Sequence, residues 1–256
     1  MDLVKFTHNE SSVICASKNG WDETIRYWSL HNNSYLRYFK GHRKKVISLA
    51  MNPVNDTFLS ASLDQTARLW DLRSNATQGL IRPVKGTPKV AFGNQGVIFA
   101  CTTENMIKLF DSRKFDSGPF ATFQVNSPSL SSFNWSSLFF SADGKYLLLS
   151  TDSTPIFLVD AFKGDLINVF NDRENNNHFP ISASFTPDSN FVLSGSSNGN
   201  ILAWKIENNS PSSPPLYPKP IATLKGHKEV VKQVLFNPTH FMLASACSSL
   251  ALWLPN

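Results

Sequence analysis

Residues 59–74 read LSASLDQTARLWDLRS, and the pattern of this stretch returns along the whole chain. Its centre, Asp-x-Thr-x-Arg-x-Trp, occurs at residues 22–28 (DETIRYW) and again at residues 64–70 (DQTARLW), so the two tryptophans lie 42 residues apart. Weaker copies follow, and across all copies the tryptophan position holds Trp28, Trp70, Phe110, Val159, Trp204 and Trp253. A unit that recurs about every 40–50 residues indicates a repeat architecture.

Each repeat consists of short apolar runs separated by turn residues. Residues 45–62 (KVISLAMNPVNDTFLSAS) and 138–150 (LFFSADGKYLLLS) each contain two such runs around Asn, Asp, Gly or Pro. Runs rich in β-branched and aromatic residues between such turns predict strands joined as hairpins, and no long stretch has a helical period. The sequence therefore predicts an all-β fold. We expect one domain over residues 1–256, with six units at about residues 3–42, 43–86, 87–130, 131–175, 176–227 and 228–256.

Two Gly-His pairs occupy the same place in two of the repeats. His42 lies 28 residues before Trp70, and His227 lies 26 residues before Trp253. Together with the period and the Trp70-Asp71 pair, this spacing resembles the WD-repeat family. The resemblance implies a β-propeller in which each repeat is a four-stranded antiparallel blade.

The resemblance also implies a hydrogen-bonded tetrad in the second unit. In the family, the tetrad joins a histidine before the first strand, a hydroxyl on the second, an aspartate in the next turn and a tryptophan on the third. The matching residues are His42, Ser60, Asp64 and Trp70, with Ser62 the less favoured hydroxyl. Buried indole, imidazole and carboxylate groups each need a partner, so we expect this set to lock the blade rather than to catalyse a reaction.

Three other units depart from the tetrad pattern. Asn198 replaces the aspartate in the fifth unit, and Val159 replaces the tryptophan in the fourth. The sixth unit has a turn that is two residues shorter and lacks an aspartate. We expect these units to depend more on apolar packing.

The three cysteines, Cys15, Cys101 and Cys247, lie far apart in apolar runs of the 256-residue chain. An odd, widely spaced set argues against a disulfide framework and for a reducing compartment, and we expect all three to be small core residues. The hydrophobic fraction of 41% is too high for a disordered chain. No apolar run approaches the ~18 residues of a membrane span.

The strongest candidate for chemistry is the stretch 195–199 (GSSNG), which matches the G-x-S-x-G pattern around a serine nucleophile at Ser197. That pattern requires a strand, a sharp turn and a helix, whereas the following residues (NILAWKI) predict a strand. A hydrolase built on Ser197 is therefore the distant alternative to a protein without catalytic residues. The six histidines are scattered singly, without zinc-spaced cysteines or a glycine-rich phosphate loop, so we predict no metal and no cofactor.

The net charge is +5, and basic residues gather in loops that a propeller places on one face. These residues are Lys18, Arg43, Lys44, Lys45, Lys85, Lys89 and Lys228. We interpret this face as a docking site for an acidic or phosphorylated peptide, with an ordinary solvated rim as the alternative. The segment 207–220 (ENNSPSSPPLYPKP) is interpreted as an extended loop, with recognition of its PxxP matches as the alternative.

Longer stretches of the sequence resemble one particular type of WD-repeat protein. Residues 22–42 (DETIRYWSLHNNSYLRYFKGH), 52–74 (NPVNDTFLSASLDQTARLWDLRS) and 241–255 (FMLASACSSLALWLP) are similar to the Swd-two type, the WD-repeat subunits of the COMPASS histone methyltransferase. The resemblance implies a nuclear, non-catalytic scaffold that binds the SET-domain methyltransferase and supports methylation of histone H3 on lysine 4. It also implies a link to RNA polymerase II with a phosphorylated C-terminal domain.

Alternative complexes follow from relatives of the same type. These are the mRNA cleavage and polyadenylation machinery and a nuclear protein phosphatase 1 complex. A substrate receptor for a ubiquitin ligase is a further alternative, although the sequence contains no family-specific ligase-docking motif. We expect no membrane contact and no direct sequence-specific contact with nucleic acid.

The Swd-two type has about seven blades, whereas this chain begins at the first strand of one unit (LVKFTHN, 3–9) and ends after the third strand of another (LALWLPN, 250–256). We therefore expect 23 strands, an incomplete ring and roughly one missing N-terminal blade. We also expect an unpaired edge strand that favours association with other chains.

Overall fold

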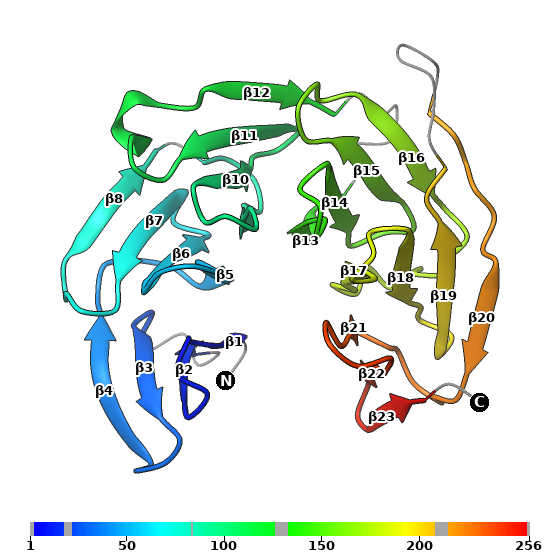
Figure 1. Ribbon diagram of the computed structural model, residues 1–256, viewed down its shortest axis with the longest axis horizontal. Helices are drawn as coiled ribbons and strands as arrows, with labels where there is room; N and C mark the ends of the chain where they lie inside the picture. The colour runs from blue at the N-terminus through cyan, green and yellow to red at the C-terminus, as the bar shows by residue number, and fades with distance from the viewer. Residues whose placement is uncertain (1–2, 18–21, 83, 126–132, 208–214, 255–256) are drawn as a thin grey trace. The chain divides into compact units, whose positions relative to one another are not determined.

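The computed structural model describes residues 3–17, 22–82, 84–125, 133–207 and 215–254 (Figure 1). These residues form 23 strands and one short 3-10 helix, in five four-stranded sheets and one three-stranded sheet. Strands that follow one another in a sheet are antiparallel neighbours. We call the sheets blades one to six in chain order. The predicted all-β class with six blade units is confirmed.

The chain divides into two compact units, unit 1 over Met1–Gln124 and unit 2 over Val125–Asn256. Blades one and two, in unit 1, consist of β1 (Leu3–Phe6), β2 (Ser12–Ala16), β3 (Ile25–Ser29), β4 (Ser34–Phe39), β5 (Val46–Met51), β6 (Thr57–Ser62), β7 (Thr66–Asp71) and β8 (Thr77–Ile81). Blade three consists of β9 (Val90–Phe92), β10 (Ile98–Thr102), β11 (Met106–Asp111), the 3-10 helix η1 (Phe115–Ser117) and β12 (Ala121–Gln124).

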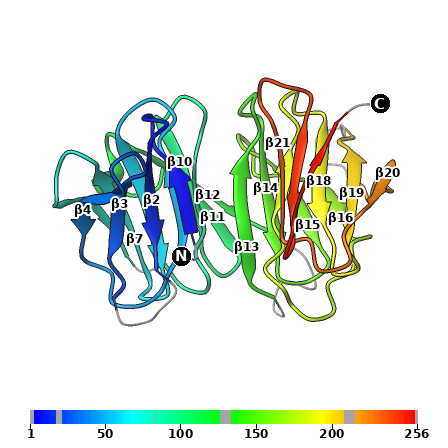
Figure 2. The ribbon, with the colours of Figure 1, turned by 90° about the horizontal axis from the view of Figure 1, so that it is seen from below.

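Unit 2 repeats this organisation. Blades four and five consist of β13 (Trp135–Phe140), β14 (Tyr146–Thr151), β15 (Ile156–Asp160), β16 (Leu166–Phe170), β17 (Ala183–Phe185), β18 (Phe191–Gly195), β19 (Asn200–Lys205) and β20 (Ala222–Lys225). Blade six consists of β21 (Gln233–Phe236), β22 (Leu243–Ala246) and β23 (Leu250–Trp253). Figure 2 shows β13, β14 and β15 standing side by side along their length.

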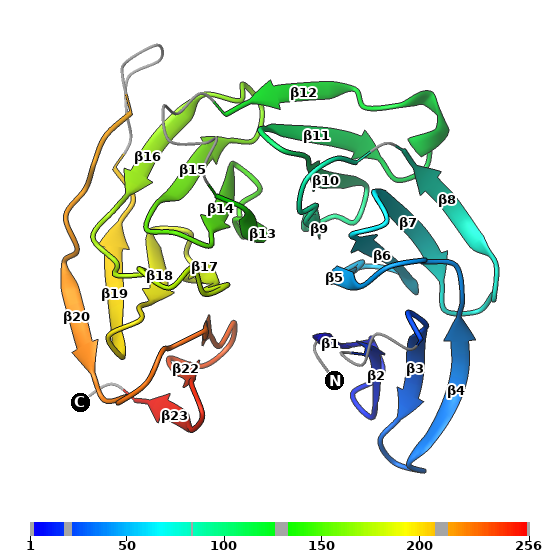
Figure 3. The ribbon, with the colours of Figure 1, turned by 180° about the vertical axis from the view of Figure 1, so that it is seen from behind.

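The first strands of neighbouring blades adjoin within each unit. In unit 1, β1 contacts β5 and β5 contacts β9, while β4, β8 and β12 form the opposite edges of their blades (Figure 3). In unit 2, β17 contacts both β14 and β21. Loops that enter the first strands therefore come close together at one end of adjacent blades.

The second strand is almost wholly buried in blades one to five. In β14, the consecutive residues Leu147, Leu148 and Leu149 are all 0% exposed. Because successive side chains of a strand point to opposite faces, continuous burial means that both faces are covered. Separate apolar clusters join blades one and two, two and three, four and five, and five and six. Each fully buried leucine contributes roughly 1.5–3 kcal/mol, so these clusters hold adjacent blades together.

Two glycines close hairpin turns that the sequence predicts. Gly144, in the β13–β14 turn, has φ +74°, and Gly199, in the β18–β19 turn, has φ +84°. Both values lie in the left-handed region that favours glycine. At Gly199 a Cβ atom would also come within 2.3 Å of the carbonyl oxygen of His227, because the turn packs against the connection that precedes β21.

Candidate functional site

Four side chains of blade two form one continuous hydrogen-bonded set. The indole N–H of Trp70, on β7, donates to Oγ of Ser60, on β6, over 2.8 Å. That hydroxyl lies 2.6 Å from Nε2 of His42, which precedes β5. Nδ1 of the same ring lies 3.0 Å from Oδ2 of Asp64, in the β6–β7 turn. The structure therefore brings together all four residues that the sequence assigns to the tetrad.

Asp64 accepts the largest number of hydrogen bonds in this set. Besides the His42 ring, the Arg43 amide donates to it over 2.9 Å, and the amide and hydroxyl of Thr66 donate over 3.0 and 2.6 Å. Burial raises the pKa of Asp64, but the hydrogen bonds from Thr66, Arg43 and His42 outweigh burial and lower the pKa to about 2. Burial lowers the pKa of His42. At neutral pH the pair is therefore a carboxylate and a neutral imidazole.

The tetrad is closed to a substrate. The side chains of His42 and Asp64 are 1% and 6% exposed, and Ser60 and Trp70 are fully buried. Ser62 lies outside the set, because its hydroxyl donates to the carbonyl oxygen of Lys44 over 2.7 Å. Groups that do not meet solvent cannot reach a reactant, so this geometry suits the locking of a blade.

Blade six contains a second set of the same shape with a different final member. Trp253 donates to Oγ of Ser245 over 2.7 Å, and that oxygen lies 2.6 Å from Nε2 of His227. Nδ1 of His227 faces the thiol of Cys247, with 3.1 Å between nitrogen and sulfur. The prediction that all three cysteines are core residues is wrong for Cys247, which is half-buried, whereas the other two are buried. The expected shortening of the turn is wrong, because the turns of blades two and six both span three residues, 63–65 and 247–249. The sequence signal is instead the shorter hairpin, with 8 residues from Ser245 to Trp253 against 10 from Ser60 to Trp70.

Blade five keeps the tryptophan without its partners. Trp204, on β19, is fully buried, yet its indole N–H has no hydrogen-bond partner among the described residues. Asn198, which replaces the aspartate, donates its side-chain amide to Glu174 over 3.0 Å. Trp204 instead packs on Phe170, with 5.4 Å between ring centroids. Apolar packing dominates here.

Arg173 is a buried residue that no sequence motif marks, since it lies in the acidic segment NDRE. It is 1% exposed, and burial lowers its pKa to about 9, so the guanidinium stays charged at neutral pH. Its acceptors are the carbonyl oxygens of Thr151, Ser153, Thr154 and Ile181 and the hydroxyl of Ser194. These acceptors belong to blades four and five, so Arg173 ties the two blades together.

The basic residues assigned to a docking face are only partly gathered. Arg43 and Lys44, in the β4–β5 connection, and Lys85, in the β8–β9 connection, are exposed. Lys45 is half-buried. Lys89 is half-buried as well and donates its ammonium to the carbonyl oxygen of Ile47 over 2.9 Å. Burial, followed by repulsion from Lys45, lowers the pKa of Lys89 to about 8, so Lys89 offers less positive charge to a ligand than its sequence position predicts.

Two residues of the predicted face do not join this group. Lys228 is exposed but belongs to unit 2, and Lys18 lies outside the described residues. The β10–β11 turn adds an acidic neighbour, because Cγ of Glu104 lies 3.1 Å from where a Cβ on Gly86 would stand. We name the exposed cations Arg43, Lys44 and Lys85 the basic edge of unit 1.

Residues 195–199 form a hairpin rather than a nucleophile elbow. They connect β18 to β19, and the Ser197 amide donates to the carbonyl oxygen of Glu174 over 2.9 Å. A nucleophile elbow passes from a strand into a helix, whereas here a strand follows. The local geometry that would expose Ser197 as a nucleophile is therefore missing from this turn.

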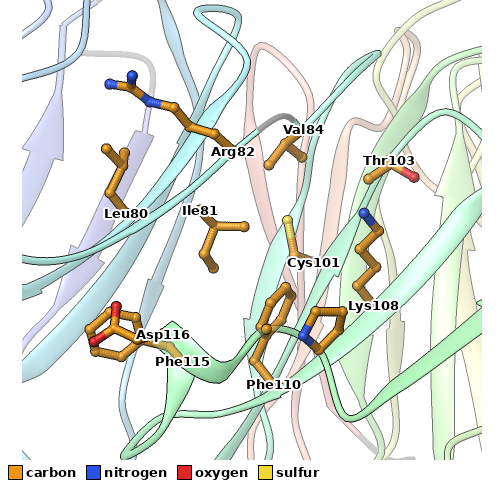
Figure 4. Close-up of a pocket in the computed structure, with 12 residues that line it drawn as sticks. Leu80, Ile81, Arg82, Val84, Cys101, Thr103, Lys108, Phe110, Phe115 and Asp116 are labelled. Atoms are coloured by element: carbon orange, nitrogen blue, oxygen red, sulfur yellow. The ribbon is translucent and has the colours of Figure 1, made fainter.

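A cleft of about 220 Å³ lies between blades two and three within unit 1. Ile81 and Cys101 line its middle, with Arg82 near one end and Asp116 near the other (Figure 4). Phe115 of η1 closes it against β8, where Gly79 leaves room for the ring; a Cβ there would come within 2.5 Å of it. At about 220 Å³ the cleft is smaller than the roughly 300–1,000 Å³ that is typical of small-molecule sites.

Among the described residues, no three His, Cys, Asp or Glu side chains are grouped so that they could hold a metal ion. No helix in the same part of the chain is long and apolar enough to cross a membrane.

Comparisons with known proteins agree on one architecture. The model of the family described as WD domain, G-beta repeat matches residues 33–71, 170–205 and 218–253. WD repeat-containing protein 82 of Drosophila melanogaster is 48% identical over 257 residues, which cover 100% of this chain and 77% of that protein. The COMPASS component SWD2 of Saccharomyces cerevisiae is 36% identical, covering 94% of this chain and 74% of that protein. The beta-propeller domain of Cps50 (Swd1) from Myceliophteria thermophila, 18% identical, has a TM-score of 0.73 over 98% of this chain and 81% of that one, which shows the fold alone.

Proposed function

The chain belongs to the Swd-two (SWD2) type of WD-repeat proteins, and from that premise we propose that it is a non-catalytic scaffold subunit of a nuclear chromatin-modifying complex. The observation that carries the proposal is similarity, over nearly the whole chain, to a protein named as a COMPASS component. In this role the chain binds the SET-domain methyltransferase and supports methylation of histone H3 on lysine 4.

The geometry of the most polar clusters supports a role in binding rather than in chemistry. The tetrad has its histidine and aspartate 1% and 6% exposed, so it stabilises blade two without meeting a substrate. The guanidinium of Arg173 is saturated by acceptors within unit 2. What remains open for partners is the surface of the blades and their connecting loops.

The basic edge of unit 1 supplies the contact for a phosphorylated partner in this proposal. Arg43, Lys44 and Lys85 are exposed, and no ion pair holds them among the described residues. Arginine and lysine side chains bind phosphate through charge-assisted hydrogen bonds. A serine-phosphorylated C-terminal domain of RNA polymerase II carries the matching charge.

Affinity purification of the tagged chain from nuclei, followed by mass spectrometry, tests the scaffold role. We expect a SET-domain methyltransferase and its companion subunits, together with a fall in trimethylated histone H3 lysine 4 after depletion of the chain. Recovery of cleavage and polyadenylation factors or of protein phosphatase 1, with no methyltransferase, would replace the proposed complex by one of those alternatives.

The basic edge is tested separately with a fluorescent serine-phosphorylated C-terminal-domain peptide and its unphosphorylated twin. Reversal of Arg43, Lys44 and Lys85 to glutamate should weaken phosphopeptide binding at least tenfold, and added salt should weaken binding to the parent chain. The matched control reverses the exposed Lys114, Lys163 and Lys205, which lie away from the basic edge in sequence. Equal loss in both triple variants would show a general charge effect and reject the basic edge as the docking site.

A further inference from the structure

Cys247 is part of a nucleophile constellation in blade six that the scaffold role does not use. Its sulfur lies 3.1 Å from Nδ1 of His227, and Nε2 of that ring lies 2.6 Å from Oγ of Ser245. Trp253 in turn donates to Ser245 over 2.7 Å. A cysteine beside an imidazole that is oriented by a third group is an arrangement that favours the thiolate in proteins.

The direction of these hydrogen bonds follows from counting protons. Because the Trp253 N–H occupies Oγ of Ser245 as a donor, the hydroxyl hydrogen of Ser245 is available for Nε2 of His227. A neutral imidazole that accepts at Nε2 carries its proton on Nδ1, and this N–H points at the sulfur. The ring therefore offers a donor to Cys247, which favours the thiolate over the thiol.

Blade two provides an internal comparison for this position. There the same tryptophan–serine–histidine series ends on a carboxylate, with Nδ1 of His42 3.0 Å from Asp64. Blade six presents a sulfur at 3.1 Å from the corresponding Nδ1. The site that holds a fixed anion in one blade thus holds a group that becomes an anion on deprotonation in the other.

Further polar groups surround the sulfur. The amide of Ser249 donates to it over 3.3 Å, and the hydroxyls of Ser249 and Ser248 lie 3.3 and 3.9 Å away. The carbonyl oxygen of Ser249 lies 3.6 Å from the sulfur, where it accepts a hydrogen bond from the thiol form. Hydrogen bonds from Ser249, with smaller contributions from Ser248 and His227, lower the pKa of Cys247 to about 7. His227 is the titratable side chain in contact with the thiol; the exposed Lys228 and Glu229 follow it on the same connection.

The other two cysteines behave in the opposite way. Cys15 and Cys101 are each 1% exposed, and burial raises the pKa of both, that of Cys101 to about 12. Cys247 is half-buried, and its neighbours Ser248 and Ser249 are exposed, so a small reagent reaches the sulfur from solvent. Thiolate character and access together decide which cysteines of a protein are modified.

We propose that Cys247, held by His227 and Ser249, is a site of reversible oxidation by hydroperoxides and of alkylation by soft electrophiles. In the oxidation, the thiolate sulfur attacks one oxygen of hydrogen peroxide. A sulfur–oxygen bond forms as the oxygen–oxygen bond breaks, the sulfur loses two electrons, and the departing hydroxide takes a proton from solvent. The products are a sulfenic acid on Cys247 and water. The proposal is independent of the scaffold role.

Alkylation of the full folded chain with iodoacetamide, read cysteine by cysteine by peptide mass spectrometry between pH 5 and 9, tests the thiol directly. We expect Cys247 to be modified with a half-maximal rate near pH 7, while Cys15 and Cys101 stay unmodified. In guanidinium chloride all three should react alike, with a midpoint near the ordinary cysteine pKa of about 8.5. With hydrogen peroxide and dimedone in place of iodoacetamide, the adduct should form on Cys247.

Variants separate an activated thiol from one that is merely exposed. Ser249→Ala and His227→Gln should each raise the midpoint for Cys247 and slow its alkylation at pH 7 by roughly threefold to tenfold. His42→Gln, the equivalent change in blade two, should leave the midpoint unchanged. A parent Cys247 that titrates at or above about 8.5 when folded, or that is as slow as Cys101, overturns the proposal without recourse to any variant.

Discussion

Replacing Asp64 by alanine removes the acceptor of four hydrogen bonds in blade two. The donors are the His42 ring, the Arg43 amide, and the amide and hydroxyl of Thr66. His42 and Thr66 are buried, so their donors cannot turn to water when the carboxylate is lost. An orphaned buried donor costs about 1–3 kcal/mol, and since such losses are not additive we expect the free energy of unfolding to fall by about 2–3 kcal/mol.

The same substitution should change how stability depends on pH. The folded-state pKa of Asp64 is about 2, below the value of about 3.9 in an unfolded chain. A depressed carboxyl pKa stabilises the folded chain fully above the unfolded value, and this stabilisation is lost as pH falls from about 4 towards 2. The difference between the two pKa values corresponds to about 2.5 kcal/mol for this 6% exposed side chain. The alanine variant should lack this part of the acid-induced loss.

Urea unfolding of parent and variant at pH 7 and pH 3, followed by tryptophan fluorescence, measures both effects. The control is Asp71→Ala, which removes a carboxylate at the end of the same region of blade two. Asp71 pairs with Arg73, whose side chain is 77% exposed, so we expect a loss within about 0.5 kcal/mol. Equal stability losses for Asp64→Ala and Asp71→Ala would refute the reasoning that the tetrad locks the blade.

Three further predictions compare buried or strained positions. Trp70→Phe should lower the free energy of unfolding by about 1–3 kcal/mol, whereas Trp204→Phe should cost less, because only the Trp70 N–H has a partner; equal losses in denaturation would contradict this. Gly199→Ala should destabilise the chain more than Gly144→Ala. Both glycines have positive φ, but only at Gly199 would the added Cβ atom come within 2.3 Å of a backbone oxygen. The melting temperatures of the two variants measure this difference. Arg173→Lys should cost at least about 1.5–3 kcal/mol, because an ammonium cannot match the fork of acceptors, and a neutral effect on urea unfolding would be the contrary result.

The predictable part of this molecule is the part that repeats. The six blade units are predicted by a tryptophan position that recurs about every 40–50 residues, and the four tetrad residues by the resemblance to the WD-repeat family. Because every blade has the same strand order, the place of a residue within its repeat predicts its place within the blade. The role of the tetrad in stability remains a prediction for the measurements above.

The unpredicted features are those that depend on side-chain contacts between blades. Arg173 lies in a segment with no repeat equivalent, and nothing in NDRE indicates that its arginine is buried against carbonyl oxygens of two blades. Lys89 is similar, because its loop position predicts exposure while its ammonium reaches the backbone at Ile47. Long side chains form hydrogen bonds with residues of a neighbouring blade, and the spacing of residues along the sequence does not show which residues these are.

The thiol of blade six shows how hairpin length, rather than residue type, selects the group beside the histidine. In blade two the acceptor, Asp64, lies four residues after the serine of the set, and in blade six Cys247 lies two residues after Ser245. Counting from the serine would match Cys247 with Ser62, whose hydroxyl instead binds a backbone carbonyl. Both turns span three residues, 63–65 and 247–249, but only one strand residue separates Ser245 from its turn, against two after Ser60. The chain therefore reaches the imidazole earlier, and a different side chain lies beside it. A repeat can thus keep its tryptophan, serine and histidine while a shorter hairpin exchanges a permanent carboxylate for a thiol that oxidants can modify.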